Sequence, residues 1–224
     1  MNSIKGVIFD LDGTLIDSSE VYTQAFNEGM QAFGLEPVSR EKLAAFLNRG
    51  IGLQDILLEA FPHAFEKEDV RQKCMNEIRM IYLKLEEEGV PLIPYAKEVL
   101  SSLKMKGLKT GIVTGRATYG DVKWLELRRL GIAQLIDAMV TGAEAERKPA
   151  PDSVIMCLEQ LGLLAEESVF VGDSQADIIA AKRAGLRVIA MTTGVASQQT
   201  LAAEEPTMII DNLTQLVATI QELV

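Results

Sequence analysis

Short apolar runs and longer helical patterns alternate along most of the chain, and the first apolar run ends in two acids. The run Val7-Ile8-Phe9 is β-branched and aromatic, which is typical of a strand buried on both faces. Asp10 and Asp12 follow where this strand is expected to end, and Gly13 comes next. Side chains separated by one residue point to the same side of an extended chain, so the two carboxylates are expected to project together. The same residues also suit a polar turn, with Asp as helix cap and Gly as turn former.

Between residues 17 and 90 the apolar positions follow helical spacing, and no convincing strand pattern occurs. The pattern predicts a first helix that ends at Gly34 and is capped by Asp17 or Ser18. Three further helices are predicted over residues 41–47, 56–62 and 66–87, the last of them long and amphipathic. This block is therefore predicted to be a compact all-helical unit inserted after the first strand.

From residue 91 onward, strand and helix patterns alternate. Strands are expected over residues 108–113, 138–141, 168–171, 186–191 and 208–210, and helices over 94–106, 121–130, 151–161, 176–184 and 213–223. This repeated order predicts an α/β fold in which a parallel sheet carries helices on both faces. We therefore divide the chain into a core domain, residues 1–16 and 91–224, and a helical domain, residues 17–90.

Composition narrows the class of protein. The 224 residues are 48% hydrophobic, as in soluble globular proteins, and a net charge of −10 argues against a nucleic-acid-binding surface. Cys74 and Cys157 lie in helical apolar patterns and are predicted to be buried thiols, which fits a reducing compartment. The N-terminus enters the first strand directly, and no apolar run approaches a membrane-spanning length. We expect a cytoplasmic protein without a membrane partner.

Polar residues gather at the ends of the expected strands, which is where ligands bind in an open parallel sheet. Taken singly, each of them could be a turn residue, a helix cap or a surface side chain. Their joint occurrence at successive strand ends instead indicates one site with a nucleophile, a hydroxyl, a cation and a metal-binding acid. The residues are Asp10 and Asp12, Thr114-Gly115-Arg116, Lys148, Gly172-Asp173-Ser174 and Asp177.

In these residues the chain resembles the haloacid dehalogenase-like (HAD) hydrolases. The resemblance rests on Asp10-Leu11-Asp12-Gly13-Thr14, Thr114, Lys148 and Gly172-Asp173-Ser174-x-x-Asp177, and it covers essentially the whole chain. The helical insert and Lys-Pro-Ala-Pro-Asp are similar to the phosphoglycolate phosphatase and β-phosphoglucomutase branch, which implies a Rossmann-like core with an inserted helical cap domain. Thr114 is a weaker match, because in many relatives the residue after this hydroxyl is Asn, whereas this chain has Gly115-Arg116.

The resemblance implies phosphoryl transfer that depends on Mg²⁺. Asp10 would attack phosphorus to form an aspartyl phosphate, and Asp12 would protonate the leaving oxygen and later take a proton from water. We expect the Asp10 charge to favour the protonated form of Asp12. Mg²⁺ would be held by Asp10, the backbone carbonyl of Asp12 and Asp173. Asp177 is expected outside this ligand set, orienting Lys148 or a metal-bound water.

The transferring phosphate is expected to be bound by Thr114, Gly115 and Lys148. Substrate choice is assigned to the helical insert, where Arg49 stands in the glycine-rich break at residues 48–52. Arg49 is a candidate for binding a carboxylate or second phosphate of the leaving group, or an ordinary surface arginine. Arg116 is a second candidate. The cap is expected to open and close about residues 17–18 and 89–91.

The leading hypothesis is a Mg²⁺-dependent phosphatase acting on a small phosphorylated metabolite, either phosphoglycolate-like or a sugar phosphate. A β-phosphoglucomutase-type mutase or a pyrophosphatase would use the same chemistry. A protein of another class, a non-enzymatic binding protein that uses the cap as an interaction surface, is disfavoured by the complete set of acids and Lys148. The physiological substrate and the oligomeric state do not follow from the sequence.

Overall fold

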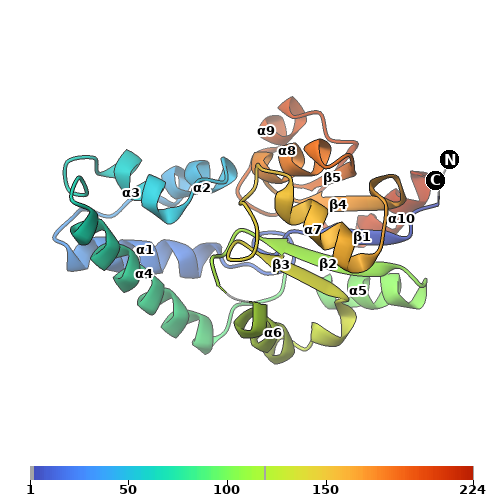
Figure 1. Cartoon of the computed structure of the whole chain (residues 1–224), viewed down its shortest axis with the longest axis horizontal. Coiled ribbons are helices and arrows are strands. Elements are labelled where there is room, and N and C mark those ends of the chain that lie inside the picture. Colours follow the sequence, from blue (N-terminus) through green and yellow to red (C-terminus); the bar gives the residue numbers. More distant parts are fainter. Residues whose placement is uncertain (1–2, 119, 224) are drawn as a thin grey trace.

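The computed structural model describes residues 3–118 and 120–223. Residues 1, 2, 119 and 224, which fall inside the predicted core-domain ranges, lie outside the described residues. Figure 1 shows a helical unit, coloured blue to green, beside an α/β unit that contains the sheet. In the described part of the chain, no helix is both long and apolar enough to cross a bilayer.

The α/β unit is built on a six-stranded sheet. Its strands are β1 Gly6–Phe9, β2 Lys109–Thr114, β3 Ala138–Thr141, β4 Ser168–Gly172, β5 Arg187–Met191 and β6 Met208–Ile210. They lie in the order β3-β2-β1-β4-β5-β6, and every neighbouring pair is parallel. All four residues of β1 are buried, and its side chains alternate: Val7 and Phe9 join one apolar cluster, and Ile8 joins the other.

Helices cover both faces of this sheet. The cluster containing Phe9 includes buried residues of α5 (Ala96–Met105), α6 (Gly120–Arg129) and α10 (Leu216–Glu222). The cluster containing Ile8 includes buried residues of α7 (Asp152–Leu161), α8 (Gln175–Arg183) and α9 (Gln198–Ala203). Short 3₁₀ turns occupy Ala133–Leu135, Ala165–Glu167 and Leu213–Gln215. The predicted fold class, a parallel α/β sheet with helices on both faces, is confirmed.

Helix α9 is absent from the sequence-based prediction. It has six residues, of which Leu201 alone is buried, so it produces no apolar period. Its start is marked by the Ser197 hydroxyl, which accepts a hydrogen bond from the Thr200 N–H. That cap is the signal by which the helix could have been found.

The helical unit has an apolar core of its own. It consists of α1 Ser19–Ala32, α2 Arg40–Asn48, α3 Leu53–Ala60 and α4 Glu68–Glu88. Phe26, Ile56, Phe65 and Ile78 belong to a cluster of buried residues formed within this unit. These helices lie where the sequence predicts them, but the exact division into domains at residues 17–90 stays a prediction.

Two neighbouring segments connect the helical unit to the α/β unit. Asp17 donates its N–H to the Pro91 carbonyl at 2.9 Å, and Ile93 donates to the Leu15 carbonyl at 2.9 Å. Ile16 and Leu92 form an isolated antiparallel bridge between the same segments. The segments that enter and leave the helical unit are thus hydrogen-bonded to each other. Any motion of the helical unit relative to the α/β unit has to bend this paired connection.

Candidate active site

The candidate site lies where the strand order reverses beside β1. Strands β2 and β3 extend to one side of β1, while β4, β5 and β6 lie on the other. In open parallel sheets the crevice at such a switch point is the usual ligand position. Asp10 follows β1 and Asp173 follows β4, and the Asp10 N–H donates to the Val171 carbonyl at 2.8 Å. A cavity of about 860 Å³ opens here between the α/β unit and the helical unit.

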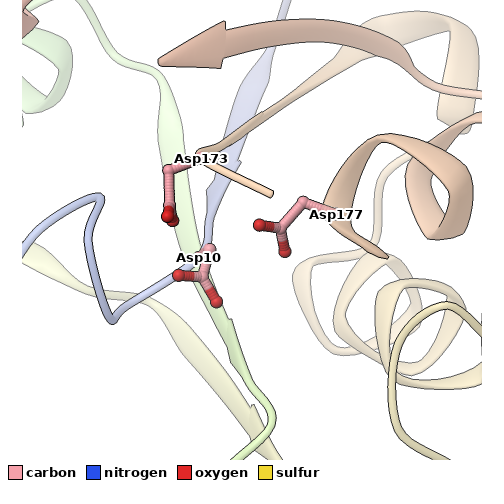
Figure 2. Close-up of side chains that lie close together, drawn as sticks. All are labelled: Asp10, Asp173 and Asp177. Atoms are coloured by element: carbon pink, nitrogen blue, oxygen red, sulfur yellow. The ribbon is translucent and has the colours of Figure 1, made fainter. Parts of the chain in front are cut away.

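Three buried carboxylates meet at this point. Asp10, Asp173 and Asp177 each offer an oxygen, and these oxygens lie within 4.8 Å of one another. Figure 2 shows the three side chains converging from the end of β1, the end of β4 and the start of α8. Lys148 Nζ lies 2.5 Å from Asp10 Oδ1 and 2.5 Å from Asp177 Oδ1, and it also donates to the Val113 carbonyl at 3.2 Å. One ammonium is therefore paired with two of the three acids.

The raised pKa values of these carboxyl groups indicate that the cluster lacks positive charge. Burial raises the pKa of Asp10, although the Lys148 ammonium acts against that shift. Burial, and then the neighbouring Asp177, raise the pKa of Asp173 to about 7. A divalent cation would favour the ionised carboxylates, and hard oxygen donors are the ligands that Mg²⁺ and Ca²⁺ prefer. The donor set therefore fits a divalent metal, with Asp10 and Asp173 as ligands and Asp177 within reach.

Asp173 is fixed by close packing and hydrogen bonds. Its Oδ1 accepts from the Thr14 hydroxyl at 3.1 Å, and its Oδ2 accepts from the Val195 N–H at 2.9 Å. Gly13 has a φ of +86°, and a Cβ placed there would lie 2.6 Å from Asp173 Oδ2. Gly13 therefore supplies both a left-handed turn after the first motif and the space that Asp173 fills.

The Asp177 carboxylate forms hydrogen bonds with two different partners, Ser174 and Lys148. Its Oδ2 accepts from the N–H and the hydroxyl of Ser174, while the Ser174 hydroxyl accepts from the Asp177 N–H, which forms a capping box at the start of α8. Its Oδ1 accepts from Lys148. The sequence offered a solvated helix residue or a positioning acid at Asp177. The side chain is instead buried, and it contacts both Lys148 and the start of α8.

Asp12 is held as a carboxylate by an arginine. Arg116 Nε donates to Asp12 Oδ2 at 2.8 Å, Arg116 Nη2 pairs with Oδ1, and the Ser18 hydroxyl donates to Oδ1 at 2.5 Å. Burial acts to raise the pKa of Asp12, but Arg116 and then Ser18 outweigh it and lower the pKa to about 2. The expectation that the Asp10 charge favours a protonated Asp12 is therefore wrong, because the bidentate guanidinium dominates.

Arg116 also links Asp12 to the helical unit. Its Nη1 pairs with Glu86 near the end of α4, and Lys123 Nζ lies 2.9 Å from the same carboxylate and 2.6 Å from Glu126 Oε2. Lys123 is almost completely buried. Sequence reasoning missed this network because its members come from α4, α6 and the loop after β2, although the Lys123–Glu126 spacing of three residues was a usable signal.

The predicted phosphate-binding residues lie beside these acids. The Thr114 side chain is buried at the end of β2, with its Oγ1 3.5 Å from Asp12 Oδ2, and the Arg116 N–H donates to that Oγ1 at 3.3 Å. Gly115 lines the cavity. Their roles in phosphate binding stay predictions, as does a role for Arg116 in substrate choice.

The structure does not bring Arg49 to the cavity. Its guanidinium pairs with Glu59 at 2.6 Å and lies over the Phe46 ring, and about half of the Arg49 and Glu59 side-chain surfaces is exposed. This position matches the surface-arginine alternative. The neighbouring Gly50, Ile51 and Gly52 do line the cavity.

The loop that contains these glycines is docked on the α/β unit. The Asn48 side-chain amide donates to Gln175 Oε1 at 2.7 Å, and the Gln175 N–H donates to Asn48 Oδ1 at 2.8 Å. A Cβ on Gly50 would lie 2.4 Å from the Lys148 carbonyl oxygen. The helical unit is therefore closed over the acid cluster on this side.

Sequence reasoning also missed several other side chains that line the cavity. Tyr22 from α1, Arg79 and Tyr82 from α4, and Arg147 beside Lys148 all line it. The rings of Tyr22 and Tyr82 meet edge to face at 6.4 Å, and the Tyr82 hydroxyl is buried without a partner among the described residues. Arg147 was visible in the sequence as the basic neighbour of Lys148, whereas the others resembled ordinary helix residues.

Comparisons with known proteins agree with this geometry. The family of haloacid dehalogenase-like hydrolases matches residues 7–191. A phosphoglycolate phosphatase from Salmonella typhimurium is 30% identical over 96% of this chain and 92% of its own length. The crystal structure of a predicted phosphoglycolate phosphatase from Haemophilus somnus superposes with a TM-score of 0.85 at 27% identity, covering 98% of this chain and 99% of that one. A candidate β-phosphoglucomutase from Thermotoga maritima shares the fold, with a TM-score of 0.75 at 23% identity over 99% of this chain and 100% of that one.

Proposed function

Because the chain belongs to the family of haloacid dehalogenase-like hydrolases, we propose that it is a Mg²⁺-dependent phosphatase that hydrolyses a small phosphate monoester through an aspartyl phosphate. The observation that carries the proposal is the buried cluster of Asp10, Asp173 and Asp177 around Lys148, open to a cavity beneath the helical unit. The phosphoglycolate phosphatase relatives support a small phosphorylated substrate.

In the first half-reaction, Asp10 is the nucleophile. One of its oxygens is engaged by Lys148 at 2.5 Å, which fixes the carboxylate orientation. Its attack forms an oxygen–phosphorus bond while the ester bond breaks, and Asp12 gives a proton to the leaving oxygen. Asp12 can carry that proton only when Arg116 releases it, so the anionic substrate has to draw the guanidinium away.

In the second half-reaction, water attacks the phosphorus of the aspartyl phosphate and Asp12 accepts its proton. The pKa of Asp12, lowered to about 2 by Arg116, supports the carboxylate form that this step needs. The bond to Asp10 breaks, inorganic phosphate leaves, and Asp10 returns as a carboxylate. Lys148 and the polar groups of Thr114 and Gly115 stabilise the charge on the transferring group.

The metal fits the carboxylates of Asp10 and Asp173, and the Asp12 carbonyl is proposed as a further ligand. When bound, Mg²⁺ supplies positive charge to the transferring phosphoryl group. Asp177 positions Lys148 through the 2.5 Å contact described above. We propose residues 17–90 as a cap that excludes water, because the Asn48–Gln175 contacts seat the helical unit over the acids.

The test is phosphate release from a panel that includes 2-phosphoglycolate, a hexose 1-phosphate, p-nitrophenyl phosphate and pyrophosphate, assayed in Mg²⁺ and in EDTA. We expect release in Mg²⁺, little in EDTA, and none from the Asp10→Asn variant. Absence of release from every ester would contradict the proposal. Conversion of the hexose 1-phosphate to its 6-phosphate would instead identify a mutase, and release from pyrophosphate alone would identify a pyrophosphatase.

A further inference from the structure

The cavity is also lined by two cationic side chains that the proposed chemistry does not use. Arg147 precedes Lys148 in the α/β unit, and Arg79 belongs to α4 of the helical unit; both line the cavity. Across residues 3–118 and 120–223, neither guanidinium has a carboxylate within 4.0 Å or a side-chain hydrogen bond. Of the other cationic side chains that line the cavity, Arg116, Lys123 and Lys148 are ion-paired, and Arg40 donates a hydrogen bond to the Ser19 hydroxyl.

Arg147 lies at the junction of the two units. A Cβ on Gly52 of the docked loop would be 2.5 Å from Arg147 Nη1, and one on Gly115 would be 3.8 Å from its Nη2. The guanidinium thus reaches from the loop after β2, where the phosphate is expected, to the loop of the helical unit. A group bound by Arg147 would therefore sit next to the transferring phosphate, on the side of the leaving group.

The charges around Arg147 favour an added anion. Burial lowers the pKa of Arg147, Tyr22 and then Asp55 act in the opposite direction, and the Arg79 charge adds a smaller lowering. Arg147 and Arg79 carry like charges and line the same partly enclosed cavity, so an anion placed between them would relieve their mutual repulsion.

We propose that Arg147 and Arg79 form a subsite for a second anionic group, a carboxylate or a phosphate on the leaving group of the substrate. This inference rests on the proposed phosphatase function and names the class of ester that the site selects. Guanidinium groups suit either anion because their fork of N–H donors matches two oxygens at once. The Tyr22 and Tyr82 rings form an aromatic wall of the same cavity, against which the carbon skeleton of the leaving group packs.

The subsite replaces the role that the sequence offered to Arg49. Recognition through this subsite would require both units, because Arg147 comes from the α/β unit and Arg79 from the helical unit. The cavity of about 860 Å³ lies within the range of pockets that hold drug-sized ligands. A leaving group larger than glycolate can therefore reach the subsite.

The experiment compares pairs of esters that differ in the second anion. One arm sets 2-phosphoglycolate against ethyl phosphate, and the other sets glucose 1,6-bisphosphate against glucose 1-phosphate. We expect kcat/KM for the ester with the second anion to exceed that of its partner at least about 10-fold in one arm, which identifies the anion as carboxylate or phosphate. Arg147→Gln should reduce this kcat/KM by about 10- to 100-fold, mainly through KM, as expected for loss of charged hydrogen bonds.

Arg79→Gln should also reduce kcat/KM for the ester that carries the second anion. Either variant should change kcat/KM for the ester without the second anion by less than about threefold. Arg128→Gln is the matched control, because Arg128 is exposed on α6 outside the cavity and loses the same charge. Equal losses on both esters of a pair, no preference in the wild type, or a loss in Arg49→Gln but not in Arg147→Gln would each overturn the subsite.

Failure of the proposed function has a different signature. In that case the wild type releases no phosphate from any ester, p-nitrophenyl phosphate included. Calorimetric binding of 2-phosphoglycolate and ethyl phosphate, and of the two glucose phosphates, then decides the subsite alone. Preferential binding of the doubly anionic member that is lost in Arg147→Gln supports the subsite, and equal binding of both members overturns it.

Discussion

Removal of the Lys148 ammonium tests the acid cluster most directly. In Lys148→Met the buried carboxylates of Asp10 and Asp177 each lose an ion pair of 2.5 Å. Breaking a buried pair by deleting one partner costs about 3–5 kcal/mol. At roughly 2–4 °C per kcal/mol for a chain of this size, Tm should fall by about 6–20 °C. Because small proteins have about 5–15 kcal/mol of stability, we expect the variant still to fold.

The assay is thermal unfolding in EDTA at pH 8, beside steady-state phosphate release in Mg²⁺. Turnover should fall by about 10²–10³-fold, the usual effect of deleting one donor to a transition-state oxyanion. Lys84→Met, which removes an exposed lysine of α4, is the matched control and should change neither quantity. Combining Lys148→Met with Asp177→Asn should cost less than the sum of the two single changes, because the double variant buries one unpaired charge fewer.

Two results would refute this reasoning. An unfolding midpoint equal to that of the wild type would mean that Lys148 does not compensate the buried carboxylates. Retention of more than about a tenth of kcat would mean that its charge is not used at the transferring phosphate, because loss of such a donor costs far more than that.

Three further predictions concern the same site. Without metal, the pKa of Asp173 in the folded protein is raised to about 7, so the free energy of unfolding should fall as pH rises from about 4 through 7. Mg²⁺ should therefore raise Tm more at pH 8 than at pH 5. An equal rise in Tm at both pH values would contradict this. Gly194→Ala places a Cβ 1.7 Å from Asp173 Oδ2 and should weaken Mg²⁺ activation at least about 10-fold. Gly120→Ala is the control and should not change the activation, because no atom lies nearer than 3.7 Å to a Cβ placed there. Equal Mg²⁺ titrations of the two variants would contradict this role of Gly194. The pKa of Asp12 in the folded protein is lowered to about 2, which contributes stability above about pH 4 that is lost as pH falls towards 2. Arg116→Met removes this contribution, so acid unfolding monitored by circular dichroism should begin at a higher pH. An unchanged acid midpoint would be inconsistent with the pairing of Arg116 and Asp12.

The sequence by itself determined the architecture and the position of the acids. The run Val7-Ile8-Phe9 is apolar on both faces, which requires a central strand, and the alternation of strand and helix patterns then requires parallel pairing. Residues that end parallel strands meet at one edge, so Asp10 and Asp173 could be placed together across more than half of the chain. Helix α9 escaped because six residues with one buried side chain carry too little periodicity.

Only the tertiary structure decided which charges pair. The partners Arg116 and Asp12 are 104 residues apart, and Lys148 and Asp10 are 138 apart, so no local pattern joins them. Arg49 and Arg147 look equally cationic in the sequence, yet the first pairs with Glu59 on the surface and the second faces the cavity. Strand ends follow from local hydrophobicity, whereas the direction and partner of a long polar side chain depend on which elements pack around it.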